Sequence, residues 1–132
     1  SNEIPYQTWW RTMYKGSGHT ANMDGIVFFR TRELDDVVAF YTDRLGAEVW
    51  REQPDCTILE AGGFRFGFCE RETAETDGII TFVVDSRAAV DECYAELEDV
   101  GESPPAYSER YGIYQCFVTD PEGRTVEIQV FE

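Results

Sequence analysis

The sequence contains one lysine and one histidine, and both lie within the first 22 of its 132 residues. Eleven basic residues stand against 26 acidic ones, which gives a formal net charge of −15. Nucleic acids and anionic membranes are bound by clusters of Lys and Arg that neutralise phosphate groups. A chain of this charge therefore predicts neither a nucleic acid partner nor a membrane partner.

Catalytic motifs are also scarce. The chain has no histidine after His19, so no Ser–His or Cys–His pair can form in that part. A glycine-rich loop for binding phosphate groups is missing as well. The sequence alone therefore predicts no cofactor.

The four cysteines, Cys56, Cys69, Cys93 and Cys116, occur singly and never as a Cys-x-x-Cys pair. Without paired spacing and histidine partners they do not predict a zinc site. Three of them lie at positions of apolar pattern, where a thiol behaves as a small buried hydrophobic group. We therefore expect structural, unpaired thiols.

Long hydrophobic runs are missing too. No apolar stretch approaches the roughly 20 residues of a membrane span, and the chain does not start like a secretory signal. These observations predict a soluble, cytoplasmic protein. Acidic surfaces with almost no lysine are typical of salt-rich cytoplasm, where counterions screen the repulsion between charges. We therefore expect a halophilic protein.

Residues 1–22 differ in composition from the remainder. Their net charge is +1. Residues 23–132 therefore carry −16, which gives −15 for the whole chain. They contain Trp9 and Trp10, two of the three tryptophans, and the opening Ser-Asn resembles the remnant of a protease site. We interpret this segment as an appended leader or a mobile arm and expect one domain over residues 23–132.

That domain contains an internal duplication. Asp24-Gly-Ile-Val-Phe-Phe recurs as Asp77-Gly-Ile-Ile-Thr-Phe, and each copy runs into an amphipathic helix with a tyrosine at the equivalent place, Tyr41 and Tyr94. Strand-like stretches follow each helix. The pattern predicts an α+β fold of two β-α-β-β-β modules, residues 23–76 and 77–132, that share a cleft. A ferredoxin-like fold is the alternative, although it needs fewer strands after each helix.

The predicted elements follow local signals. A helix begins near Leu34 and ends at Leu45, before Gly46, and a second helix runs from an N-cap at Ser86 to Val100. Pro104-Pro105 is expected to delay the following strand until Ala106. The remaining strands are predicted at residues 26–31, 48–52, 56–60, 64–69, 79–84, 114–119 and 125–131.

With these motifs in view, residues 23–132 resemble the glyoxalase/bleomycin-resistance/dioxygenase group, the vicinal-oxygen-chelate superfamily. Three stretches carry the resemblance: Ala39-Phe40-Tyr41 closing with Leu45-Gly46, its repeat over residues 77–101, and Asp120-Pro-Glu-Gly-Arg-Thr-Val-Glu-Ile at residues 120–128. The resemblance implies the same fold of paired modules, and a small organic molecule as ligand.

Members of this group that use metals place a ligand on the first and fourth strand of each module. The corresponding positions here are Ile26, Gly67, Ile79 and Glu127. Only Glu127 can ligate a metal, and the nearby Asp24 and Asp77 would form an unusual site with it. The resemblance therefore implies that this protein binds no metal ion. We expect the Glu127 carboxylate to bond to Arg30, Gln129, a tyrosine or water, and we retain it as a candidate catalytic base.

Strand alternation sends every second residue towards the cleft. The predicted ligand-binding residues are Phe28, Arg30, Trp50, Arg65, Gly67, Thr81, Tyr114 and Gln129. Gly67 is disfavoured inside a strand unless something, such as a ligand, needs the space. Three alternatives stay open: Arg30 pairs with Glu127 as a structural ion pair, Arg65 lies solvated at the rim, and the aromatic side chains serve packing.

Three functions are compatible with this pattern. The first is metal-free binding of a small organic molecule between the modules, as in the bleomycin-resistance type. The second is a metal-dependent lyase, isomerase or ring-cleaving dioxygenase with Glu127 as base or sole metal anchor. The third is a dimerisation or regulatory module. Because the predicted sheets leave edge strands and one open face, we also expect a homodimer.

Overall fold

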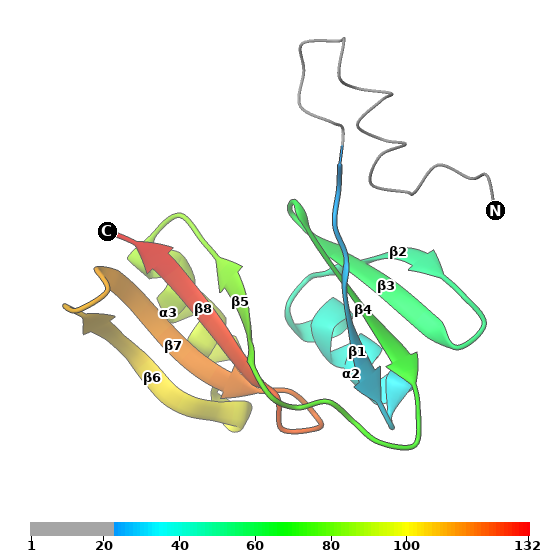
Figure 1. The fold of residues 1–132 in the computed structure, drawn as a ribbon. Helices are drawn as coiled ribbons and strands as arrows, with labels where there is room; N and C mark the ends of the chain where they lie inside the picture. Colours follow the sequence, from blue (N-terminus) through cyan, green and yellow to red (C-terminus); the bar gives the residue numbers. More distant parts are fainter. Residues whose placement is uncertain (1–22) are drawn as a thin grey trace, which may run out of the picture.

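The computed structural model describes residues 23–132 as two four-stranded sheets, each with one principal helix (Figure 1). The leader proposed for residues 1–22 lies outside the described residues. No helix in residues 23–132 is long and apolar enough to cross a membrane. The first module contains β1 (Val27–Thr31), α2 (Leu34–Ala39), a π-helix (Phe40–Arg44), β2 (Glu48–Glu52), β3 (Cys56–Ala61) and β4 (Phe64–Glu70). The second contains β5 (Ile79–Val83), α3 (Arg87–Glu96), a 3-10 turn (Glu98–Val100), β6 (Gly101–Ser108), β7 (Ile113–Thr119) and β8 (Thr125–Phe131).

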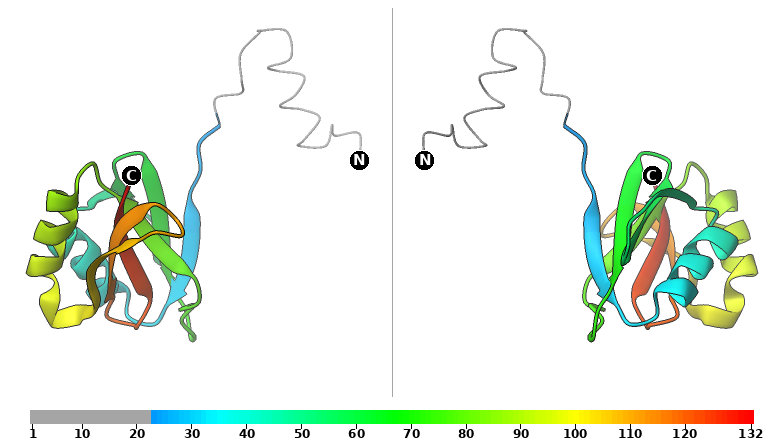
Figure 2. Two further views of the ribbon diagram at one scale, coloured as in Figure 1. Left: turned by 90° about the vertical axis from the view of Figure 1, so that its left-hand side faces the viewer. Right: turned by 90° about the vertical axis from the view of Figure 1, so that its right-hand side faces the viewer.

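Both sheets have the same topology, which confirms the predicted α+β fold. The strand orders are β1-β4-β3-β2 and β5-β8-β7-β6. The first strand of each module runs parallel to the fourth, and the other pairs are antiparallel. Figure 2 shows α2 and α3 on the same side of the molecule. We call the opposite side of the two sheets, which carries Phe28, Gly67, Thr81 and Glu127, the open face.

The first helix changes its winding where the sequence predicts one regular helix. After α2 the chain widens into a π-helix over Phe40–Arg44, and the consecutive residues Phe40 and Tyr41 are both buried. Their rings meet edge to face at 5.1 Å between centroids. Gly46 follows with φ of 75°, the left-handed conformation that suits glycine after a helix.

In the second module, α3 starts where the sequence predicts, whereas the strand that follows it starts earlier than predicted. The Ser86 hydroxyl accepts a hydrogen bond of 3.0 Å from the N–H of Ala89, a standard N-cap. The strand β6 begins at Gly101 rather than Ala106, so Pro104 and Pro105 lie within it. This edge strand tolerates proline because the register shifts on both sides of Ser103.

The hydrophobic core is continuous across the two modules. Phe82 on β5 lies 5.7 Å from Phe66 and 6.0 Å from Phe64 on β4, between ring centroids. It also lies 6.3 Å from Tyr41, which is fully buried. An aromatic cluster on the helix side therefore joins the sheets and fixes the seam between them.

The turn at residues 120–124, between β7 and β8, connects the modules through buried polar groups. The Arg124 side chain is 2% exposed, and its guanidinium donates to the carbonyl oxygens of Arg30 (2.6 Å) and Glu75 (2.7 Å). The same guanidinium contacts the carboxylates of Asp120 at 3.1 Å and Glu122 at 2.9 Å. This stretch of the family resemblance thus holds the second module against the first, and we call residues 120–124 the clasp.

Candidate ligand site at the seam

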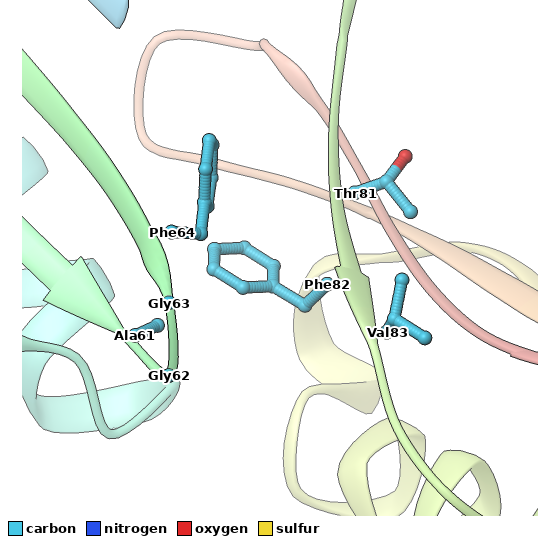
Figure 3. Close-up of a pocket in the computed structure, with 7 residues that line it drawn as sticks. All are labelled: Ala61, Gly62, Gly63, Phe64, Thr81, Phe82 and Val83. Atoms are coloured by element: carbon cyan, nitrogen blue, oxygen red, sulfur yellow. The ribbon is translucent and has the colours of Figure 1, made fainter. Parts of the chain in front are cut away.

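A pocket of about 520 Å³ opens where the β3–β4 turn meets β5. Its lining residues are Ala61, Gly62, Gly63, Phe64, Thr81, Phe82 and Val83. Figure 3 shows the rings of Phe64 and Phe82 directed towards one another, while the side chains of Thr81 and Val83 point away from this pair. Among the predicted ligand-binding residues, only Thr81 lines the pocket. Sequence reasoning missed the β3–β4 turn, although its Gly62-Gly63 pair marks a place where the backbone is accessible.

Phe28 and Gly67 occupy neighbouring, in-register positions on β1 and β4. A Cβ atom added to Gly67 would lie 2.6 Å from Cε1 of Phe28, so the phenyl ring fills the space above the glycine. The prediction that this space serves a ligand is therefore wrong. Phe28 remains 46% exposed, which leaves the outer side of its ring accessible on the open face.

The equivalent positions of the second module hold a polar pair. Thr81 and Glu127 are in register on β5 and β8, and the Thr81 hydroxyl donates a hydrogen bond of 2.7 Å to Oε1 of Glu127. Glu127 is 9% exposed. We expected its partner to be Arg30, Gln129, a tyrosine or water; the side chain that bonds to it is instead Thr81 of the adjacent strand.

The family's four metal positions do not form a metal site in this chain. Ile26, Gly67 and Ile79 have no ligating atoms, and Glu127 uses one carboxylate oxygen to accept from Thr81. No three His, Cys, Asp or Glu side chains within residues 23–132 lie together in a way that could hold a metal ion. The donor set therefore does not fit a divalent ion, which requires three or four protein ligands.

The two candidate arginines lie apart from Glu127. Arg30 approaches Glu75 at 4.0 Å, with both side chains about half exposed, so the alternative of an Arg30–Glu127 ion pair is wrong. Arg65 donates to Glu60 at 2.8 Å and to Asp24 at 2.5 Å. The alternative that Arg65 lies at the rim of the cleft and is only solvated is therefore also wrong.

Two further predicted ligand-binding residues, Trp50 and Gln129, have protein neighbours of their own. The Arg65 guanidinium lies 4.4 Å from the centre of the Trp50 ring, which fixes the indole as a packing surface for Arg65. Gln129 is 7% exposed and lies in register with Val83 on β5. Neither residue lines the seam pocket.

Tyr114 points towards α3 rather than the cleft, which corrects its prediction as a ligand-binding residue. It pairs in register with Val130, a buried residue on the helix side of β8. Its hydroxyl donates a hydrogen bond of 2.6 Å to Asp91 on α3, and the Arg87 guanidinium lies 4.6 Å from its ring centre. Through these contacts the Tyr114 side chain holds α3 against the sheet.

Two of the four cysteines form a disulfide, which contradicts the expectation that all are free thiols. Cys56 and Cys69 face each other in register on β3 and β4, with Cα atoms 4.0 Å apart. Because Cys69 alternates with Phe68 and shares the side of Gly67, the bond lies on the open face. Cys93 and Cys116 are free, and burial raises the pKa of the Cys116 thiol to about 11.

The paired β-α-β-β-β modules, each with its first strand parallel to its fourth, define the class of protein to which this fold belongs. The family model described as Glyoxalase/Bleomycin resistance protein/Dioxygenase superfamily matches residues 17–128. The chain belongs to this superfamily, as the sequence resemblance indicated.

Solved structures share this fold at low sequence identity. The chain is similar to a glyoxalase/bleomycin resistance protein/dioxygenase family enzyme from Burkholderia phytofirmans PsJN, with 23% identity and a TM-score of 0.72 over 83% of this chain and 100% of that one. It is also similar to a lactoylglutathione lyase from Agrobacterium tumefaciens, with 21% identity and a TM-score of 0.66 over 85% and 95% of the two chains. No curated protein matches the sequence. At these identities the similarity establishes the fold alone.

Proposed function

We propose that this protein binds a small organic molecule at the seam pocket and the adjoining open face, without a metal ion. The observation that carries the proposal is the Thr81–Glu127 pair beside an apolar pocket of about 520 Å³. A few polar groups within apolar walls are the usual composition of a small-molecule site. Thr81 connects the pocket with the polar pair, because it lines the pocket and donates a hydrogen bond to the Glu127 carboxylate.

The proposed ligand has an apolar body and a group that donates hydrogen bonds. Phe64 and Phe82 provide apolar surface at the pocket, and Phe28 adds an exposed ring on the open face. The Glu127 carboxylate has two oxygens, of which Thr81 engages one. A ligand donor that reaches the other oxygen would satisfy a nearly buried charge.

A ligand screen tests this proposal. We expect compounds with such a donor to raise the melting temperature and to appear as bound species in native mass spectrometry in high salt. The matched variants are Glu127→Gln, which removes the charge at constant size, and Glu72→Gln at an exposed position. Binding that is equal in both variants, or absent throughout a broad screen, would contradict the proposed site.

An enzyme that uses Glu127 as a general base is the second candidate. It is favoured by the nearly buried carboxylate next to a pocket, which is the environment of many catalytic acids and bases. A glyoxalase-type assay with added nickel, zinc, iron or manganese separates the two candidates. Turnover that depends on both a metal and Glu127 would replace the binding role with a catalytic one.

We also propose a homodimer. Ile79 (58% exposed), Val83 (61%) and Phe131 (64%) leave apolar surface on strands β5 and β8. Exposed apolar groups near unpaired strand edges are commonly covered by a partner. Sedimentation in high salt should give twice the chain mass of 15.1 kDa. A sedimentation coefficient of the 15.1 kDa monomer at micromolar concentration would contradict it.

A further inference from the structure

The disulfide joins two strands that are already paired along their length. The β3–β4 ladder contains six in-register pairs, from Cys56–Cys69 to Ala61–Phe64, and a tight turn closes it. A disulfide stabilises a fold mainly by restricting chain entropy in the unfolded state, and this effect is smallest for short loops. With a sequence separation of 13, the bond contributes less than one that closes a long loop, and the hydrogen bonds of the hairpin hold the two strands together in either redox form. Both redox forms can therefore keep the same fold.

The two sulfur atoms differ in their surroundings. Cys56 is 7% exposed, and a carboxylate oxygen of Asp55 lies 3.4 Å from its sulfur. Cys69 is more exposed, and the residue in register with it on β1 is Arg30, whose side chain is 60% exposed. A negative neighbour disfavours a thiolate and a positive one favours it, but Asp55 also pairs with Arg71 at 2.9 Å and Arg30 approaches Glu75 at 4.0 Å. Access to solvent is therefore the main difference between the two sulfur atoms. The asymmetry makes Cys69 the sulfur that meets a reagent from solution.

The other thiols are separated from this pair. Cys93 and Cys116 belong to α3 and β7 in the second module. Cys116 is fully buried and Cys93 is partly buried, and burial raises the pKa of both thiols. Exchange with Cys116 would require the second module to open, whereas Cys93 is only partly shielded and has no neighbouring cysteine on the open face. The chain thus presents one accessible pair on its open face.

We propose that Cys56 and Cys69 form a reversible thiol–disulfide site that exchanges with small disulfides and thiols on the open face. In the oxidising direction, the Cys69 thiolate attacks one sulfur of a small disulfide, and the first small thiolate leaves. The Cys56 thiolate then attacks the Cys69 sulfur of the mixed disulfide, and the second small thiolate leaves. Two protein thiols lose two electrons, the small disulfide gains them, and the two released protons protonate the leaving thiolates.

The first experiment equilibrates the folded protein in buffers of reduced and oxidised glutathione, followed by alkylation and mass mapping. We expect a single two-electron transition at Cys56 and Cys69, with unchanged circular dichroism in both forms. Three results would overturn the proposal: reduction only after unfolding, reduced cysteines that do not reoxidise while folded, or a transition located at Cys93 or Cys116.

The second experiment uses the matched variants Cys56→Ser and Cys69→Ser with oxidised glutathione as the probe. We expect Cys56→Ser to form the mixed disulfide at Cys69 at least tenfold faster than Cys69→Ser forms it at Cys56. Adding Arg30→Gln to Cys56→Ser should slow the reaction and shift its pH profile to higher pH. Equal rates for the two single variants would remove the assignment of Cys69 as the attacking thiol.

Discussion

The hydroxyl of Tyr41 in the first module donates a hydrogen bond of 2.9 Å to the carboxylate of Asp120 in the second. Both groups are buried, and Asp120 also pairs with the guanidinium of Arg124. Burial, the nearby Asp120 charge and this hydrogen bond all raise the pKa of Tyr41, so the phenol stays protonated. A buried carboxylate that is shared by a phenol and a guanidinium therefore connects the two modules.

Replacing Tyr41 by phenylalanine should weaken this connection. The Tyr41→Phe variant leaves one buried oxygen of Asp120 with fewer donors, which costs about 1–3 kcal/mol of unfolding free energy. Urea denaturation in high salt measures the change. The matched control is Tyr111→Phe, at a position that is 66% exposed, where we expect a change within about 0.5 kcal/mol. Equal losses in both variants would show that the hydrogen bond to Asp120 contributes nothing specific.

Acid should loosen the clasp through Glu122. Burial alone would raise the pKa of this carboxyl, but hydrogen bonds from the Thr31 hydroxyl, the Arg32 N–H and the Arg124 guanidinium outweigh burial and lower it. A lowered pKa in the fold stabilises the protein above the unfolded value of about 4.3. That contribution is lost as the pH falls below this value and passes through the folded pKa.

The measurement for Glu122 is the unfolding free energy between about pH 6 and pH 3. Glu122→Gln should be less stable near neutral pH and should lose less stability on acidification than the natural chain. Glu72→Gln, at an exposed position, serves as the control and should follow the natural profile. A natural and a Glu122→Gln profile of the same slope would exclude Glu122 as the acid-sensitive group.

Phe28 and Gly67 should behave as a coupled pair. In Gly67→Ala the new methyl group meets the Phe28 ring at 2.6 Å, so the ring must move. Because this ring is 46% exposed and can turn aside, we expect a loss of about 0.5–1.5 kcal/mol, the cost of moving a side chain off its preferred rotamer. In the Phe28→Ala background the same glycine substitution should cost less, since the obstructing ring is gone. Additive effects in this double-mutant cycle would contradict the contact.

Salt should strengthen the fold because residues 23–132 carry a net charge of −16. Screening extends over about 10 Å at 0.1 M salt and about 3 Å at 1 M. We expect a clearly lower melting temperature, or loss of the fold, below roughly 0.1 M salt. A melting curve that is unchanged between dilute buffer and concentrated KCl would remove the interpretation of this protein as halophilic.

Local patterns in the sequence were sufficient for much of the fold. Alternation along β8 placed Glu127 on the open face and Val126 and Ile128 under the helix, and both valine and isoleucine are fully buried. The Ser86 cap and the repeated modules also follow from neighbouring residues. These features depend on periods of two or 3.6 residues, which a short stretch of chain already contains.

Partners across strands could not be predicted in the same way. The Thr81–Glu127 bond, the Cys56–Cys69 bond and the direction of Tyr114 all depend on strand register. A shift of one residue reverses the side of every side chain in a strand, and nothing local fixes that shift. The same limit applies to the bonds of Arg124 with the carbonyls of Glu75 and Arg30, which lie 49 and 94 positions away in the sequence.

The clasp also bears on how the proposed ligand site would select its ligand. The segment between the modules is held at Arg71 and Glu75: the Arg71 N–H donates to the Thr31 carbonyl, and the Glu75 N–H donates to the Arg30 carbonyl while the Glu75 carbonyl accepts from Arg124. These bonds restrain the connection over residues 71–75. For the ligand proposed above, we therefore expect selection by size and shape on entry to the seam pocket rather than by closure of the two halves.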